Sequence, residues 1–234
     1  MKKTIVCIGG TKGIGKAVIK KLLAEEYHVH LYSRTMPPEE ISNSNLLTHV
    51  QYDASVDFMA DTLPEEVDGY IYFPGSINLR PFERLSIEEF QADLDINYLH
   101  NVRILQKVMA KLKKSTNDAS VVFFSTVAVQ TGMPFHTSIA GAKGALEGLT
   151  RSLASEYAPK VRVNCISPSL TETPLAEKIT SNEKMREASA AKHPMKRIGT
   201  AEDLANLAVF LLSSESSWIT GQNISCDGGM NCLK

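Results

Sequence analysis

The strongest constraint on this chain is a glycine-rich turn that joins an apolar strand pattern to an amphipathic helix pattern. The apolar run 5–8 breaks into the sequence GGTKGIG at residues 9–15, and apolar residues then recur every three or four positions through residue 23. Glycines at these spacings permit a tight turn, let the backbone approach a ligand and let the helix pack closely on the strand. The free N–H groups at the positive end of that helix predict a phosphate-binding site.

Short β-rich runs alternate with longer helical patterns through the rest of the chain, which predicts a parallel sheet covered by helices on both faces. The expected strands are 5–8, 29–32, 46–52, 70–73, 121–124, 161–166 and 224–226. The expected helices after the first are 54–63, 87–112, 139–157, 175–190 and 201–212. Thr200 and Asp203 are spaced as a capping box at the start of the last helix. We find no repeat, low-complexity tract or linker, so we expect one domain.

Composition excludes several other classes of protein. The 25 Lys and Arg against 26 Asp and Glu give a formal charge of -1 over 234 residues, which does not suit nucleic-acid binding. We expect no membrane-spanning segment, and the short apolar run behind Met1 is a first strand rather than a signal peptide. The four cysteines lack paired metal spacing, so we expect no metal site, reduced thiols and a cytoplasmic protein.

The end of the second expected strand indicates which dinucleotide binds. An acidic residue at this point commonly binds the ribose 2′-hydroxyl of NAD, whereas a 2′-phosphate needs cations and hydrogen-bond donors. The chain has Ser33 and Arg34 there, and Lys12 lies in the glycine turn. A guanidinium and an ammonium beside one pocket favour NADP(H), the alternative being two solvated surface charges.

These residues and their order resemble the short-chain dehydrogenases/reductases over essentially the whole chain. The resembling segments are the glycine turn, Asp53, Asn97, the run RVN at 162–164 before Pro168, and the tail from HPM at 193–195 to DGG at 227–229, which is similar to that of 3-oxoacyl-acyl-carrier-protein reductases. The resemblance implies cofactor contacts from Gly9, Thr11, Lys12, Gly13, Ile14, Ser33, Arg34, Asp53, Gly75, Lys143, Pro168, Thr171 and Thr173.

The chain departs from the family where the chemistry takes place. Family members carry Tyr-x-x-x-Lys on one helix face, the tyrosine as proton donor and the lysine binding the nicotinamide ribose. Here Lys143 is present, but Ile139 stands in place of the tyrosine. Thr126, with Ser125 beside it, occupies the position of the serine that holds the substrate oxygen, and a hydroxyl that only satisfies backbone groups is the alternative.

Two further residues and one segment bear on how the site differs from that of the family. Asn97 matches the asparagine of the family's fourth helix, with a role in a helix bend as the alternative. His136 lies seven residues before Lys143, where the related enoyl reductases place their tyrosine, so it is either a substitute acid or a surface histidine. The segment 72–75 reads YFPG where the family has Asn-Asn-Ala-Gly, which removes two polar side chains from the cofactor wall.

The predicted fold is a single-domain Rossmann fold over 1–234, with a doubly wound parallel sheet of about seven strands, helices on both faces and a substrate-loop insertion near 169–198. The predicted function is NADP(H)-dependent reduction of a carbonyl or enoyl group in a small or carrier-bound substrate. The candidate catalytic residues are Thr126, Lys143, Asn97, Ser125 and His136. The alternative is a catalytically silent NADP(H)-binding sensor or scaffold. The resemblance also implies a homodimer or homotetramer.

Overall fold

The computed structural model describes residues 2–233. These residues contain one sheet of seven parallel strands in the order β3-β2-β1-β4-β5-β6-β7. The strands are β1 Thr4–Ile8, β2 His28–Ser33, β3 Leu47–Gln51, β4 Gly69–Tyr72, β5 Ala119–Phe124, β6 Val161–Pro168 and β7 Asn223–Cys226. The chain winds outward from β1 in one direction and from β4 in the other. The predicted doubly wound α/β fold is therefore confirmed, and β1 and β4 enclose its switch point.

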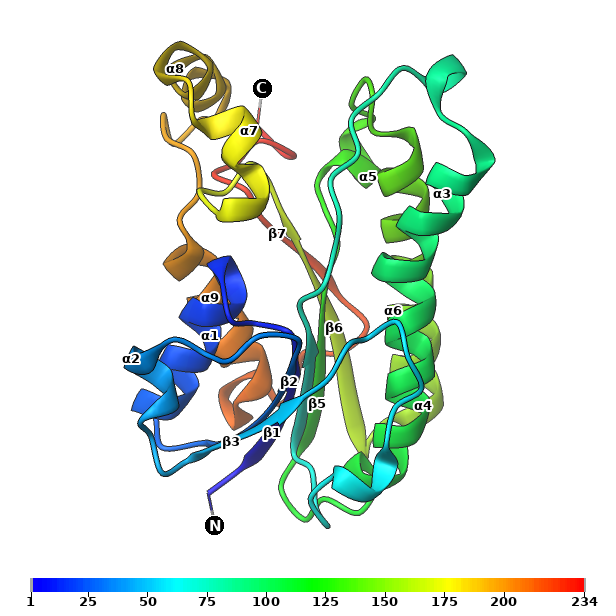
Figure 1. Cartoon of the computed structure of the whole chain (residues 1–234), viewed down its shortest axis with the longest axis vertical. Helices are drawn as coiled ribbons and strands as arrows, with labels where there is room; N and C mark the ends of the chain where they lie inside the picture. Colours follow the sequence, from blue (N-terminus) through cyan, green and yellow to red (C-terminus); the bar gives the residue numbers. More distant parts are fainter. Residues whose placement is uncertain (1, 234) are drawn as a thin grey trace.

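Helices cover both faces of the sheet (Figure 1). One face carries α1 Gly13–Ala24 and α9 Ala201–Leu212, and the other carries α3 Ile87–Leu94, α4 His100–Leu112 and α6 Thr137–Tyr157. The N-terminus of α9 has the expected capping box, because Thr200 Oγ1 accepts from the N–H of Asp203 while the Asp203 carboxylate accepts from the N–H of Thr200. No helix within residues 2–233 is long and apolar enough to cross a bilayer.

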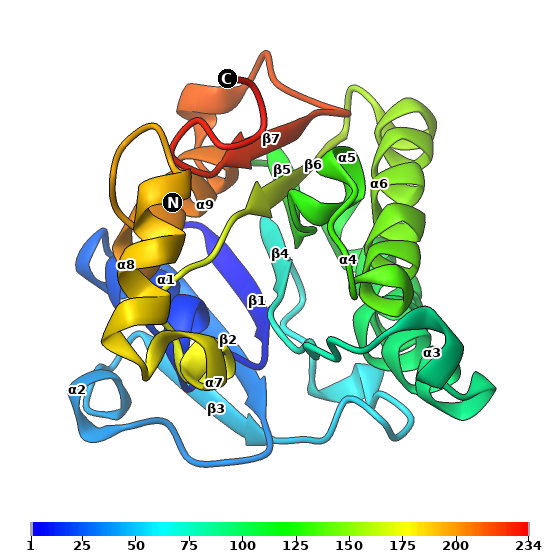
Figure 2. The ribbon, with the colours of Figure 1, turned by 90° about the horizontal axis from the view of Figure 1, so that it is seen from above.

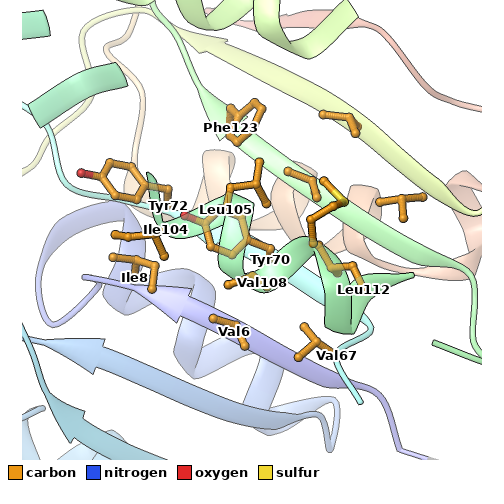
Figure 3. Close-up of a cluster of buried hydrophobic side chains, with 14 of the residues drawn as sticks. Val6, Ile8, Val67, Tyr70, Tyr72, Ile104, Leu105, Val108, Leu112 and Phe123 are labelled. Atoms are coloured by element: carbon orange, nitrogen blue, oxygen red, sulfur yellow. The ribbon is translucent and has the colours of Figure 1, made fainter. Parts of the chain in front are cut away.

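Two apolar clusters hold these layers together, because successive strand residues point to opposite faces. Val6, Tyr70 and Phe123 face the layer of α4 and α6, and Figure 3 shows part of this cluster around Leu105 of α4. On the other face, Cys7 of β1 and its partners on the adjacent strands, Leu31 and Ile71, pack against α1 and α9. A sheet buried on both sides explains the nearly continuous apolar strands of the sequence.

The helix expected over 87–112 is interrupted by a π-helical turn, η3 Asp95–Leu99, between α3 and α4. The buried side chain of Asn97 lies in this turn and donates from Nδ2 to the carbonyl oxygen of Asp93, at 2.8 Å. Such a turn widens the helix locally and reorients the residues that it contains. It brings Asn97 to the carboxyl end of the sheet.

The prediction of a helix over 54–63 was wrong. Only the short turn η1 Ala60–Thr62 is helical there. The Asp53 carboxylate accepts from the N–H of Ser55, which is an Asx turn that competes with helix formation. The Arg103 guanidinium binds the carbonyl oxygens of Ala54 and Val56, which a helix would have needed for its own hydrogen bonds.

The segment between β6 and α9 lies beside the carboxyl ends of the strands (Figure 2). Instead of the single helix expected over 175–190, it contains η4 Pro174–Ala176, α7 Glu177–Thr180 and α8 Glu183–Lys192. Asn182 separates the two helices by capping α8, since its side-chain oxygen accepts from the N–H of Met185. The sequence predicted none of the remaining short segments, which are α2 Glu39–Ser42, α5 Ala128–Thr131, η2 Phe82–Arg84 and η5 Ser214–Ser216.

Candidate functional site

One cavity of about 960 Å³ lies at the carboxyl ends of the strands. Its lining includes every residue predicted from the sequence to bind cofactor or take part in catalysis: Gly9, Thr11, Lys12, Gly13, Ile14, Ser33, Arg34, Asp53, Gly75, Asn97, Ser125, Thr126, His136, Lys143, Pro168, Thr171 and Thr173. The cavity is at the upper end of the size range of ligand sites. Residues up to 164 positions apart in the sequence thus meet at one place.

The glycine turn forms a narrow cradle at one end of this cavity. Gly9, Gly10 and Gly13 have φ angles of 70°, 109° and 54°, which side chains rarely allow. A Cβ atom on Gly15 would lie 2.4 Å from the Cα of Gly10, so α1 approaches the turn as closely as its backbone permits. The N–H groups in the first turn of α1 have no partner within the helix and are suited to an anion such as a pyrophosphate.

Lys12 lies in the turn between β1 and α1, Arg34 directly follows β2, and both line the cavity. Within residues 2–233 neither side chain has an ion-pair partner. Thr11 and Thr35 share a hydrogen bond of 3.1 Å beside them. Unpaired cations next to hydroxyl groups are suited to a phosphate and are not needed by a ribose hydroxyl.

Ile139 and Lys143 lie one turn apart on α6, and both line the cavity. Ile139 is 5% exposed, so its side chain is part of the packed wall. Lys143 Nζ donates to the carbonyl oxygen of Phe124 at 2.7 Å, and burial lowers the pKa of this amine to about 8. The lysine expected from the Tyr-x-x-x-Lys pattern is therefore in position beside an aliphatic side chain.

The two adjacent hydroxyls after β5 differ in their availability. Ser125 Oγ is buried and donates its only proton to the carboxylate of Glu147, at 2.6 Å. Thr126 Oγ1 accepts from the N–H of Ala128 at 3.2 Å and keeps its own proton for another acceptor. Thr126 is thus better placed to donate to a ligand oxygen in the cavity.

Asn97 and Lys143 flank Gly75, where a Cβ atom would lie 3.0 Å from Asn97 Oδ1 and 3.8 Å from Lys143 Nζ. Within residues 2–233 the buried Oδ1 of Asn97 has no hydrogen-bond partner. Buried polar atoms normally have one, so this oxygen is suited to a water or ligand donor. The glycine cradle, the two unpaired cations and the unpartnered Asn97 Oδ1 together suit the cavity to a dinucleotide.

A buried carboxylate that the sequence reasoning missed supports this region. Asp93 accepts from the hydroxyls of Ser76 and Ser138, and Ser76 Oγ in turn accepts from Asn97 Nδ2. Ser138 directly precedes Ile139, so Asp93 ties the start of α6 to α3. Asp93 and Ser138 are 45 positions apart, and no spacing signal in the sequence links them.

His136 occupies the position directly before α6, makes no side-chain hydrogen bond to the helix terminus, and lines the cavity. Its Nδ1 lies 2.7 Å from the carbonyl oxygen of Pro134, so that nitrogen carries a proton and Nε2 is left to face other groups. Phe73 and Pro74 pack against the glycine turn, whereas Tyr72 turns into the core and donates to the carbonyl oxygen of Ile96 (Figure 3). Tyr72 therefore does not close the cavity.

Comparison with known proteins agrees with this site. The family model described as enoyl-(acyl carrier protein) reductase matches residues 9–231. A tropinone reductase homologue of Arabidopsis thaliana is 32% identical over 246 residues, covering 97% of this chain and 91% of the relative. The 3-oxoacyl-[acyl-carrier-protein] reductase of Thermotoga maritima is 36% identical over 148 residues, covering 63% of this chain and 59% of that protein.

Solved structures show the same similarity. The ligand-free aldohexose dehydrogenase of Thermoplasma acidophilum is 25% identical with a TM-score of 0.91, over 100% of this chain and 95% of that one. ElxO with NADP bound is 26% identical with a TM-score of 0.89, over 98% and 99% of the two chains. The chain belongs to the short-chain dehydrogenase/reductase family of oxidoreductases.

The lowered pKa of Lys143 leads to a prediction for its titration. Because burial disfavours the ammonium form, the amine should hold its proton below about pH 8 and lose it as the pH rises through that value. NMR of ¹³C- and ¹⁵N-labelled lysine should show one side chain titrating near pH 8, and Lys143→Met should remove that signal. A Lys143 signal titrating near the ordinary lysine value of about 10.4 would contradict the burial argument.

Proposed function

We propose that this protein is an NADP(H)-dependent oxidoreductase that reduces a carbonyl, or a conjugated enoyl group, in a small or carrier-bound substrate. The observation that carries the proposal is the single cavity that joins the glycine cradle and the two unpaired cations to Thr126 and Lys143. A binding protein without chemistry would need only the first half of that cavity. We call the part of the cavity around Thr126 and Lys143 its substrate end. The presence of these two side chains there supports an enzyme rather than a binding protein.

The residues that would hold the dinucleotide follow from their positions in the cavity. The turn 9–15 and the start of α1 would take the pyrophosphate, and Lys12 with Arg34 the 2′-phosphate. Lys143 and Asn97 Oδ1 would lie near the nicotinamide ribose, and Asp53 near the adenine. The bound cofactor supplies a hydride, and the protein positions it and the substrate. ElxO, a relative at 26% identity, has been solved with NADP bound, which favours the same cofactor.

The substrate end of the cavity combines the Thr126 hydroxyl with apolar walls. Thr126 would donate a hydrogen bond to the substrate oxygen and so stabilise the negative charge that develops on it. Apolar side chains line the same end, namely Ile77, Leu79, Met133, Leu175, Ile179 and Met230. This lining favours a substrate with an apolar body or acyl chain. The proton for the new hydroxyl would come from water, Lys143 or His136, since Ile139 has none to give.

The assembly and location of the protein are part of the same proposal. The small residues Ala140, Gly141, Gly144 and Gly148 lie along α6, where they would let a helix of a second copy approach. We expect a homodimer or homotetramer in the cytoplasm, as the family resemblance implies.

The cofactor preference should depend on Arg34. If Lys12 and Arg34 bind the 2′-phosphate, NADPH should bind at least about ten times more tightly than NADH, a difference of about 1.4 kcal/mol or more. Arg34→Ala should remove most of this preference. Fluorescence titration with both cofactors measures it, and Arg84→Ala, which removes an exposed arginine outside the cavity lining, is the matched control. Equal affinities of the parent protein for the two cofactors would refute the preference.

Turnover should depend on the hydrogen bond from the Thr126 hydroxyl to the substrate oxygen. Thr126→Val keeps the shape but removes the donor, and the loss of one such donor typically lowers kcat by a factor of about 10² to 10³. Thr126→Ser keeps the donor and should retain most of the activity. Turnover of a 3-oxoacyl thioester and of a vicinal diketone is measured from the loss of NADPH absorbance. Thermal unfolding of each variant checks whether loss of the hydrogen bond from Ala128 destabilises the protein. A fully active Thr126→Val protein would assign the donor elsewhere.

A further inference from the structure

Ser169 and His193 form a hydrogen-bonded pair on the wall of the cavity. Ser169 directly follows the end of β6, and His193 directly follows α8. Ser169 Oγ lies 2.8 Å from His193 Nε2, and the histidine is 3% exposed. The two residues are 24 positions apart. They meet because the segment between β6 and α9 folds back beside the carboxyl ends of the strands (Figure 2).

The contacts of His193 determine which way the hydrogen bond runs. Its Nδ1 lies 2.8 Å from the carbonyl oxygen of Ser189, which can only accept, so Nδ1 carries a proton. In the neutral ring Nε2 is then an acceptor, and Ser169 donates its hydroxyl proton to it. Met230 Sδ lies 3.0 Å from the same hydroxyl, but a thioether sulfur is the weaker acceptor. The pair is therefore arranged to pass a proton between a hydroxyl and an imidazole.

The pair lies beside the substrate end of the cavity. The carbonyl oxygen of Pro168, the residue before Ser169, accepts from the N–H of Val127 at 3.1 Å, and Val127 directly follows Thr126. Ser169 and His193 line the large cavity together with Thr126, Ile139 and Lys143. A hydroxyl group with an imidazole behind it thus faces the same space as the proposed oxygen donor.

A second cavity of about 100 Å³ also borders Ser169 and His193. The charged residues in its lining are Arg197, Asp203 and Asp227, and Lys192 lines the large cavity next to His193 in the sequence. A cavity of this volume with charged groups in its lining has room for water. Water there would border both Ser169 and His193 and could supply a proton to Nε2.

We infer that Ser169 and His193 form a proton relay to the substrate oxygen and so replace the tyrosine that is absent at position 139. The inference rests on the proposed function. In reduction, one solvent proton delivered by water first binds Nε2 and makes the imidazolium. The carbonyl carbon then receives the hydride, the carbonyl oxygen takes the Ser169 hydroxyl proton, and Ser169 Oγ takes the proton from Nε2, which leaves the imidazole neutral again. In oxidation of the alcohol, the proton moves from the substrate hydroxyl through Ser169 to the neutral Nε2. Ser169 is the catalytic residue, and His193 acts through it.

Four substitutions separate a relay from a tie between α8 and β6. Ser169→Ala and His193→Gln remove proton transfer, and each should lower kcat at least about a hundredfold, the lower range for one acid–base group. Both should leave the dissociation constant of NADPH within about twofold. Ser169→Thr keeps the hydroxyl and should retain activity within about tenfold, whereas a steric role would tolerate Ala better than Thr. His28→Gln, at an exposed histidine outside the cavity lining, is the matched control.

A double variant tests the replacement itself. Ile139→Tyr places a phenol one helical turn from Lys143, so it should restore much of the turnover lost in Ser169→Ala. Ile139→Phe adds the ring without the hydroxyl and should restore none. Turnover is measured with NADPH and two probes, a 3-oxoacyl thioester and a vicinal diketone.

A measurement without cofactor reads the pair directly. Long-range ¹H–¹⁵N spectra should show a proton on Nδ1 of His193, identified by the signal lost in His193→Gln, and Ser169→Ala should shift its Nε2 resonance. A parent protein that oxidises no NADPH with either probe refutes the proposed function and the relay with it. A parent that does so, with Ser169→Ala equally fast or with the whole loss falling on His136→Gln instead, refutes the relay alone.

Discussion

The rest of the structure depends on the close contact between the start of α1 and the end of β1. Gly10 and Gly15 meet with no room for a side chain on either, since a Cβ on Gly15 would also lie 2.9 Å from the ring of Phe73. This contact directs the first turn of α1 toward the carboxyl ends of β1 and β4, the central strands from which the chain winds outward in opposite directions. Because all strands are parallel, their carboxyl ends then bring the other functional residues to the same cavity.

The cavity wall around position 139 keeps its packing, although the side chain there has no proton to donate. Ile139 packs in the wall of the cavity, Lys143 keeps its place through the carbonyl oxygen of Phe124, and Thr126 keeps a proton to donate. What the isoleucine removes is the proton source next to the lysine. For the proposed reduction we place the proton source in the pair of Ser169 and His193, which a contact of 2.8 Å joins on the wall of the same cavity.

The sequence predicted the parts of this protein that depend on local patterns. Strand alternation, the glycine turn and the capping box at Thr200 are set by neighbouring residues, and the structure confirms them. The helix expected at 54–63 failed because distant Arg103 binds the carbonyl oxygens of that segment. The π-helical turn at Asn97 likewise depends on a side chain competing for a backbone oxygen, which periodicity does not register.

The candidate site divides in the same way. Residues that a motif places, such as Gly9 and Lys143, were predicted by number and lie in the cavity. The contacts of Asp93 with Ser138, and of Ser169 with His193, join residues 45 and 24 positions apart through the packing of separate helices. Such pairs leave no periodic signal, so only the folded chain reveals them.

Transfer of a labelled hydride tests most directly whether this site performs redox chemistry without a tyrosine. NADPH deuterated at C4, on each face in turn, is incubated with the protein and a panel of 3-oxoacyl thioesters and vicinal diketones. Mass spectrometry then measures how much deuterium each product contains. We expect the label from one face to appear on the carbinol carbon of an alcohol product. Tight binding of NADPH with the label retained on the cofactor for every carbonyl would contradict an oxidoreductase and leave a dinucleotide-binding protein.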